Sequence, residues 1–245
     1  MLSSSAKPAR PDELPERSSE LSALGEWLHA VHQSSVGHVA LVAGEAGVGK
    51  TTLLRRLCED ADDGARILWG ACDSLFTPEP LGPLLDIADA TGGEVAEVIA
   101  DGAKPHAIAT ALLRELARPA STLLVIEDLH WADEATLDVL RVVARRIGSV
   151  PTLLLASYRH DGLDRRHPLR VVLGELTTAE HVSRVVVPPL SPSAGPSSRH
   201  PTGSTPISST ARRVGTRSSS PRYWPPARSR SRRRSVTPCL LAPPG

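Results

Sequence analysis

One eight-residue segment constrains this 245-residue chain more than any other. Residues 44–51, Gly-Glu-Ala-Gly-Val-Gly-Lys-Thr, match the pattern G-x-x-x-x-G-K-S/T at every fixed position. An apolar run, residues 38–43, precedes the segment, and helical spacing from about residue 49 to 60 follows it. A glycine-rich turn between a buried strand and a helix is a setting that binds nucleotide phosphates, and these flanks disfavour a chance match. The sequence therefore predicts a phosphate-binding loop.

The residue types in this loop suit ATP with Mg²⁺. Glycines permit backbone angles and a close approach that side chains would block, so the loop amides and the helix N-terminus can point at the phosphates. We expect Lys50 at the β and γ phosphates and the Thr51 hydroxyl on Mg²⁺. The residues of this segment predicted to bind the nucleotide are Gly44, Glu45, Ala46, Gly47, Val48, Gly49, Lys50, Thr51 and Thr52.

Two adjacent carboxylates follow a second apolar run. Glu127 and Asp128 come directly after residues 122–126. A P-loop site needs a carboxylate at the tip of a neighbouring strand, to hold Mg²⁺ and to orient water. We expect Asp128 to serve the metal, directly or through water, and Glu127 to lie near the attacking water, with the reverse assignment open. Without the phosphate loop, an ordinary acidic strand end would explain the pair equally well.

Three residues further along have weaker support. Asp133 precedes a helix predicted to start at Glu134, and an N-cap explains it better than catalysis. Trp131 is expected to have a packing role. Arg159 lies just past the apolar run of residues 152–156, at the edge where ligands bind in parallel sheets. Spacing alone does not decide between a sensor of the γ phosphate and a solvated arginine.

Strands and helices alternate along most of the chain. The predicted strands are residues 38–43, 66–70, 122–126, 152–156 and 182–187. Helical spacing marks residues 21–31, 49–60 and 134–147, and residues 81–118 are expected to be helical in two or three pieces, interrupted at residues 92–93 and at Pro105. This alternation predicts an α/β fold, a P-loop NTPase three-layer sandwich with a mostly parallel five-stranded sheet. We expect it to occupy residues 16–190, after a disordered lead of residues 1–15.

The two ends of the chain differ in charge. Residues 1–190 hold 18 Lys and Arg against 27 Asp and Glu, a net charge of −9, whereas residues 191–245 hold ten Arg and no acidic residue, +10. The basic tail has too few apolar residues to offset chain entropy, so we expect disorder there. Residues 228–234 could hold nucleic-acid phosphates nonspecifically, although a solvated charge run is the better explanation.

The cysteines and the hydropathy pattern indicate the compartment. Cys58, Cys72 and Cys239 lack metal-ligand spacing and are expected as reduced thiols. Residues 1–11 lack the apolar core of a signal peptide, and no apolar run approaches the ~20 residues that span a bilayer. We expect a cytoplasmic protein with no membrane partner.

Three stretches together resemble the ATPase domain of large LuxR-type bacterial transcription regulators, within the STAND branch of AAA-like P-loop ATPases. They are residues 44–51, 124–138 and 154–159, and the resemblance covers about residues 12–190. It implies a nucleotide-controlled switch, with Glu127 and Asp128 as the acidic metal-and-water pair and Arg159 as the sensor arginine. It also implies that Arg17 lies near the adenine, with Glu16 standing where the family has glycine.

The resemblance stops near residue 192. Residues 190–192 resemble the opening of the family's helical lid, but the lid, helical repeats and C-terminal helix-turn-helix do not follow. We interpret the remainder as a frameshifted or otherwise truncated end.

The sequence therefore predicts an ATP- and Mg²⁺-binding regulatory module of a LuxR-type regulator, which hydrolyses ATP slowly if at all. Its expected partners are another copy of itself or a regulatory protein, with DNA reached through the missing C-terminal domain or weakly through the basic tail. The alternatives are a nucleic-acid-binding protein acting through that tail, an inactive truncated remnant, and a small-molecule kinase.

Overall fold

A five-stranded sheet forms the centre of the computed structural model, which describes residues 15–61, 65–74, 79–164 and 166–190. Its strands are β1 (His38–Gly44), β2 (Arg66–Ala71), β3 (Thr122–Glu127), β4 (Thr152–Arg159) and β5 (Val182–Val187). They lie in the order β2-β3-β4-β1-β5, and each neighbouring pair is parallel. The predicted α/β fold is confirmed, with a sheet that is parallel throughout rather than mostly so. The carboxyl ends of all five strands consequently lie along one edge.

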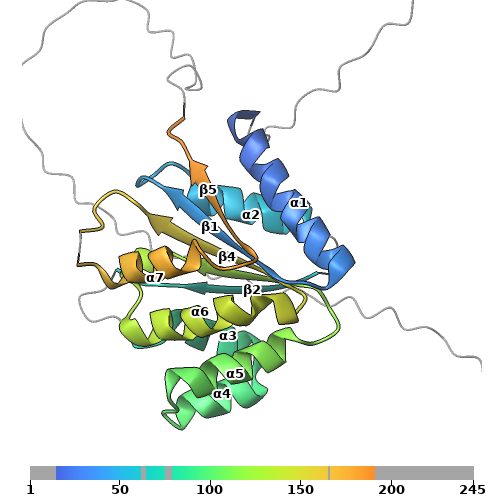
Figure 1. Ribbon diagram of the computed structural model, residues 1–245, viewed down its shortest axis with the longest axis vertical. Coiled ribbons are helices and arrows are strands. Elements are labelled where there is room, and N and C mark those ends of the chain that lie inside the picture. Colours follow the sequence, from blue (N-terminus) through green and yellow to red (C-terminus); the bar gives the residue numbers. More distant parts are fainter. Residues whose placement is uncertain (1–14, 62–64, 75–78, 165, 191–245) are drawn as a thin grey trace, which may run out of the picture. The chain divides into compact units, whose positions relative to one another are not determined.

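Helices cover both faces of this sheet, as Figure 1 shows. One face carries α1 (Ser18–Ser34) and α2 (Lys50–Asp60). The other carries α3 (Gly82–Thr91), α5 (Pro105–Leu116), α6 (Glu134–Arg146) and α7 (Pro168–Leu176), while α4 (Gly93–Ala100) packs on α3 and α5. Three short 3-10 turns complete the described part: η1 (Pro15–Arg17), η2 (Leu129–Trp131) and η3 (Ile147–Ser149). The predicted three layers are thus present.

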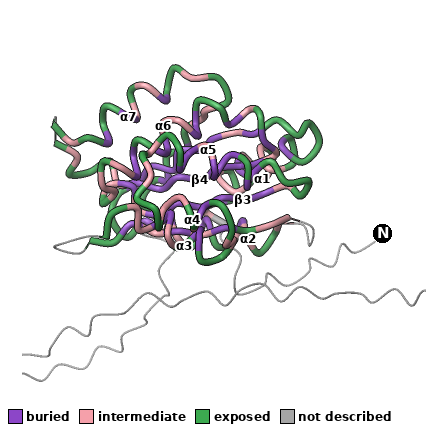
Figure 2. Tube along the Cα trace, turned by 90° about the horizontal axis from the view of Figure 1, so that it is seen from below, coloured by how far each residue is buried: buried purple, intermediate pink, exposed green. Residues whose placement is uncertain are grey.

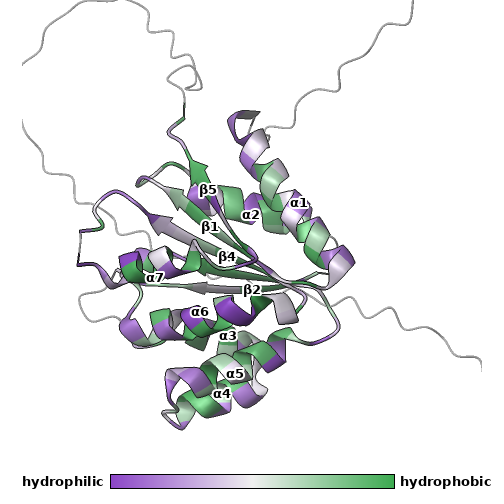
Figure 3. Ribbon diagram, in the orientation of Figure 1, coloured by the Kyte–Doolittle hydropathy of each residue, from purple (hydrophilic) through white to green (hydrophobic). Residues whose placement is uncertain are grey.

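The strands are apolar at consecutive positions because both faces of the sheet are covered. On β1, Val39 and Leu41 join the core under α6 and α7, whereas Ala40 and Val42 join the core under α1 and α2. All six residues of β3 are buried. Figure 2 shows this burial at the centre of the fold, and Figure 3 shows that the hydrophobic residues follow the strands and the inner sides of the helices.

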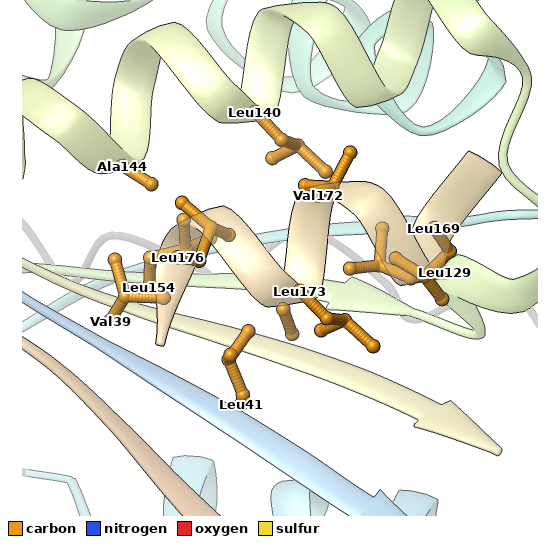
Figure 4. A pocket seen from close by; sticks show the side chains of 11 residues that line it. Val39, Leu41, Leu129, Leu140, Ala144, Leu154, Leu169, Val172, Leu173 and Leu176 are labelled. Atoms are coloured by element: carbon orange, nitrogen blue, oxygen red, sulfur yellow. The ribbon is translucent and has the colours of Figure 1, made fainter. Parts of the chain in front are cut away.

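Helix α7 is not among the segments predicted from the sequence. Pro168 stands in its first turn, and the His167 side chain caps the helix by accepting a hydrogen bond from the Leu169 amide at 3.2 Å. Leu169, Val172 and Leu176 are buried against the sheet. Figure 4 shows a small cavity beneath this helix, lined by 11 apolar side chains from α6, α7, η2 and the sheet. Such a lining offers nothing to a phosphate or a metal ion, so the cavity belongs to the core.

Several other expectations concern the ends of the chain and its thiols. The expected disordered segments, residues 1–15 and 191–245, lie outside the described residues apart from Pro15, as does Cys239. Cys58 and Cys72 are free thiols as expected, and burial raises the pKa of each to about 12. Among the described helices, none is both long and apolar enough to cross a bilayer.

Candidate functional site

The loop predicted to bind phosphate connects β1 to α2. Its glycines are required for two reasons, backbone conformation and lack of space for a side chain. Gly47 (φ 74°) and Gly49 (φ 93°) adopt the left-handed conformation, which other residues reach only with strain. At Gly44 there is no room for a side chain, since a Cβ there would lie 2.8 Å from Val48 Cγ2 and 3.0 Å from the carbonyl oxygen of Val187. The loop is therefore a fixed backbone shape that larger residues would disturb.

Lys50 lies folded onto its own loop. Its Nζ donates hydrogen bonds to the carbonyl oxygens of Gly44, at 3.0 Å, and of Glu45, at 2.8 Å. Burial lowers the pKa of this lysine, which is 7% exposed, and the nearby negative charge of Asp128 acts in the opposite direction. The lysine is thus held at the mouth of the loop by protein groups that a bound phosphate would replace.

The two carboxylates that end β3 face different neighbours. Glu127 is 8% exposed and lies beside Thr51: burial raises its pKa, and the Thr51 hydroxyl opposes that shift. Its Oε1 has no hydrogen-bond partner among the described residues. Asp128 has a left-handed backbone (φ 55°) and a half-exposed side chain that faces Lys50. Its amide donates to the buried Ser157 hydroxyl on β4 at 3.1 Å, which fixes this turn.

Arg159 ends β4 directly beside the phosphate loop, because the strand register pairs it with Gly44. Its Nη2 lies 3.4 Å from Oδ2 of Asp161, and its Nε is buried without a hydrogen-bond partner in the described part of the chain. Its charge contributes to the lowered pKa of Lys50. The structure thus brings the loop, Glu127, Asp128 and Arg159 together at the carboxyl ends of β1, β3 and β4.

His130 is a site neighbour that the sequence reasoning missed. Its side chain is 9% exposed, and neither ring nitrogen has a hydrogen-bond partner within the described ranges. Its Nδ1 lies 3.9 Å from Oδ1 of Asp128. Burial lowers the pKa of His130, Asp128 opposes this, and Arg159 and Lys50 lower it further. A neutral imidazole therefore packs beside Asp128 at neutral pH.

Arg17 supports the loop from the start of α1. Its side chain is buried, and its Nη2 donates a hydrogen bond to the Val48 carbonyl oxygen at 2.9 Å. Glu20 lies 3.9 Å from its other terminal nitrogen. This buried bond ties the N-terminal helix to the backbone of the phosphate loop, while a place for Arg17 beside the adenine stays a prediction.

Asp133 is the N-cap of α6, as expected. Its Oδ2 accepts hydrogen bonds from the amides of Ala135, at 3.1 Å, and Thr136, at 3.3 Å, and its Oδ1 accepts one from the Leu81 amide at 3.2 Å. Trp131 is 45% exposed and its ring lies beside that of His130, with the ring centroids 5.1 Å apart, so its packing role stays a prediction. It is the last residue of the short η2 turn.

Asp133→Ala should therefore destabilise the fold without changing nucleotide affinity. Removing a cap costs about 1–2 kcal/mol of unfolding free energy, and we expect that loss in chemical denaturation. Asp138→Ala is a matched control, because Asp138 is exposed on the same helix and makes one surface ion pair, with Arg141. A nucleotide affinity that falls while stability stays unchanged would contradict the capping role.

The charged groups around the loop fit a metal–triphosphate complex. Three cations and three carboxylates meet here: Lys50, Arg55, Arg159, Glu127, Asp128 and Asp161. The three carboxylates repel the negative charge of a free triphosphate, and Mg²⁺ would offset that repulsion. The unpaired oxygen of Glu127 beside the Thr51 hydroxyl offers two hard ligands. No group of three His, Cys, Asp or Glu side chains placed to hold a metal ion occurs in the described part.

Ser157 and Asp161 also escaped the sequence reasoning. Ser157 interrupts the apolar run of β4, and that single polar residue was a usable signal. Asp161 follows the strand in a loop, where its sequence context resembles that of any solvated acid. Only the parallel pairing of β4 with β1 brings it to the phosphate loop.

Comparison with known proteins identifies similar chains. Residues 13–156 match a family model described as AAA ATPase domain. An uncharacterized protein of Rhizobium meliloti (strain 1021) is 25% identical over 215 residues, covering 68% of this chain and 21% of the relative. The chain thus spans about a fifth of that relative's length.

Solved structures share the fold. The Orc1 protein of Aeropyrum pernix, in complex with DNA, superposes with a TM-score of 0.51 at 23% identity, over 74% of this chain and 47% of that one. Cdc6p of Pyrobaculum aerophilum gives a TM-score of 0.48 at 22% identity, over 73% and 47%. At 23% identity the likeness to Orc1 concerns the fold alone, and this chain spans about half the length of each of the two proteins.

Proposed function

Because the chain belongs to the AAA ATPase domain family, we propose that it binds ATP with Mg²⁺ between β1, β3 and β4 and acts as a nucleotide-controlled module. One observation carries this proposal: a glycine-shaped loop with a buried lysine meets a buried glutamate whose Oε1 is unpaired. A carboxylate that is buried and only partly paired costs free energy. A metal ion shared with phosphate would offset that cost.

We assign the metal to Thr51 and Glu127, and the attacking water to Asp128. This is the reverse of the first expectation and is the alternative that the sequence left open. It is supported by the position of Glu127 beside the Thr51 hydroxyl and by the exposed side of Asp128, where a water molecule has access. The His130 ring lies beside this carboxylate, with its Nδ1 3.9 Å from Oδ1 of Asp128.

The remaining residues contribute charge and position. In-line attack of water on the γ phosphate builds negative charge, which Lys50 and Arg159 offset. Mg²⁺, when bound, supplies further positive charge to the phosphate oxygens. We propose slow turnover, because both cations are engaged by protein groups: Lys50 by loop carbonyls and Arg159 by Asp161.

We further propose that the domain serves a LuxR-type transcription regulator, with self-association or a regulatory protein as its partner. The stretch of residues 124–138 supports this context through its resemblance to that family. The Rhizobium relative supports the idea that such a domain works as one part of a larger protein, because the match covers only 21% of that relative. Direct DNA binding by residues 1–190 is disfavoured by their net charge of −9.

The proposal is tested by titrating the full chain with a fluorescent ATP analogue, with Mg²⁺ and again with excess chelator. We expect unlabelled ATP to compete and chelation to weaken binding by about tenfold, a loss of ~1.4 kcal/mol. Nonspecific binding of ATP to the ten arginines of residues 191–245 can be told apart from binding at the loop. Nonspecific binding there would strengthen on chelation, since free ATP carries more negative charge, and would decline steeply with salt. Absence of competed, Mg²⁺-dependent binding overturns the proposal.

A further inference from the structure

Asp161 is a third carboxylate at the phosphate loop, with no place in the metal or water roles. It lies two residues beyond β4 and is 39% exposed. Its Oδ2 is 3.4 Å from Arg159 Nη2, and its negative charge acts to raise the pKa of Lys50. Partial removal from water acts to raise the pKa of Asp161. The net shift is nevertheless downward, because its own backbone amide, Arg159 and the Ala46 amide favour the ionised form.

These partners are the kinds of group that bind phosphate. Ala46 belongs to the phosphate loop, whose amides point at anions. Arg159 is the cation that the strand register places beside Gly44. In the free protein, the carboxylate of Asp161 thus engages the Ala46 amide and the Arg159 guanidinium, which a bound phosphate would use. Two anions cannot share these donors without strong repulsion at this distance.

We propose that Asp161 competes with the γ phosphate for Arg159 and thereby biases the site toward the diphosphate. This rests on the proposed binding of nucleotide to the same loop. ATP must displace Asp161 from Arg159, whereas ADP leaves the pair in place. The chain then resides in its ADP-bound or free form until another interaction, such as a partner's contact with the loop after β4, withdraws Asp161. A nucleotide switch with a high threshold for ATP is the result.

The size of the effect follows from the exposure of the pair. A partly exposed ion pair changes an equilibrium constant by up to about fivefold. We therefore expect Asp161→Asn to bind ATP about fivefold more tightly in Mg²⁺, with ADP affinity changed less than twofold. The measurement is displacement of the fluorescent analogue from the full chain by ATP and by ADP. Asp164→Asn, an exposed acid of the same loop, removes the same charge and should change neither affinity.

Arg159→Ala separates a local contact from a general charge effect. If Asp161 acts through Arg159, Asp161→Asn should lose most of its effect on ATP in the Arg159→Ala background. Equal tightening of ATP and ADP by Asp161→Asn would overturn the inference, and so would weaker ATP binding, since Asp161 would then hold Arg159 in a productive position. Failure of the wild-type chain to bind any nucleotide would instead reject the proposed function.

Discussion

Lys50→Ala is expected to weaken binding of the fluorescent ATP analogue in Mg²⁺ by about 100-fold, because one charge-assisted contact to phosphate is worth about 1.5–3 kcal/mol. Lys50 is the buried cation that the loop carbonyls of Gly44 and Glu45 hold at the phosphate position. A neutral side chain also removes the positive charge that faces Asp128, Asp161 and Glu127. Equilibrium titration of the full chain, with the wild type alongside, measures the change.

The loss should not come from unfolding. Burial already lowers the pKa of Lys50, so its charge is a cost to the fold. The variant should therefore unfold at a temperature no lower than that of the wild type. Lys104→Ala is the matched control, since Lys104 is exposed at the start of α5. If the two variants bind the analogue equally, the loop is not the nucleotide site.

The parts of the fold that the sequence predicts well are those set by local pattern. The loop from Gly44 to Thr51 carries its own geometry, because left-handed glycines and a following helix are specified by adjacent residues. The strands are readable because a parallel sheet buried on both faces requires continuous apolar runs, as in β3. These signals suffice for the sheet and for the approximate place of the site.

The parts that the sequence does not predict depend on which strand lies next to which. Glu127 and Asp128 look equivalent along the chain, and only the packing of α2 against β3 puts Glu127 beside Thr51. Asp161 reaches the loop only through the pairing of β4 with β1. Helix α7 has nine residues, too few turns for its period to stand out from the surrounding loop. Such details are tertiary, whereas periodicity is local.

Glu127→Gln should have two effects of opposite sign. It removes a buried charge whose pKa burial raises, so the metal-free protein should gain about 1 kcal/mol of unfolding free energy at neutral pH, or about 2–4 °C in Tm. It also removes the carboxylate that we assign to the metal. Binding of the ATP analogue should then no longer depend on Mg²⁺, and its affinity should fall about tenfold. The reason is that an amide is a poorer ligand for the ion than a carboxylate.

The pH dependence of the stability gain has a definite sign. A carboxyl group with a raised pKa in the folded state stabilises the fold at low pH, and that contribution is lost as pH rises through the folded-state pKa. The difference in unfolding free energy between Glu127→Gln and the wild type should therefore be small at acid pH. It should increase as the pH rises above the pKa of an ordinary glutamate. Glu97→Gln, on the exposed side of α4, should show no such gap.

Asp128→Asn decides between the two assignments of the carboxylates. If Glu127 holds the metal, Asp128→Asn should keep the Mg²⁺ dependence of binding and impair only phosphate release, because Asp128 then acts on the water. If Asp128→Asn abolishes the Mg²⁺ dependence and Glu127→Gln does not, the first expectation from the sequence is right. A Glu127→Gln variant that is less stable than the wild type would show that the buried charge is paired, and it would remove the physical reason for a metal at that position.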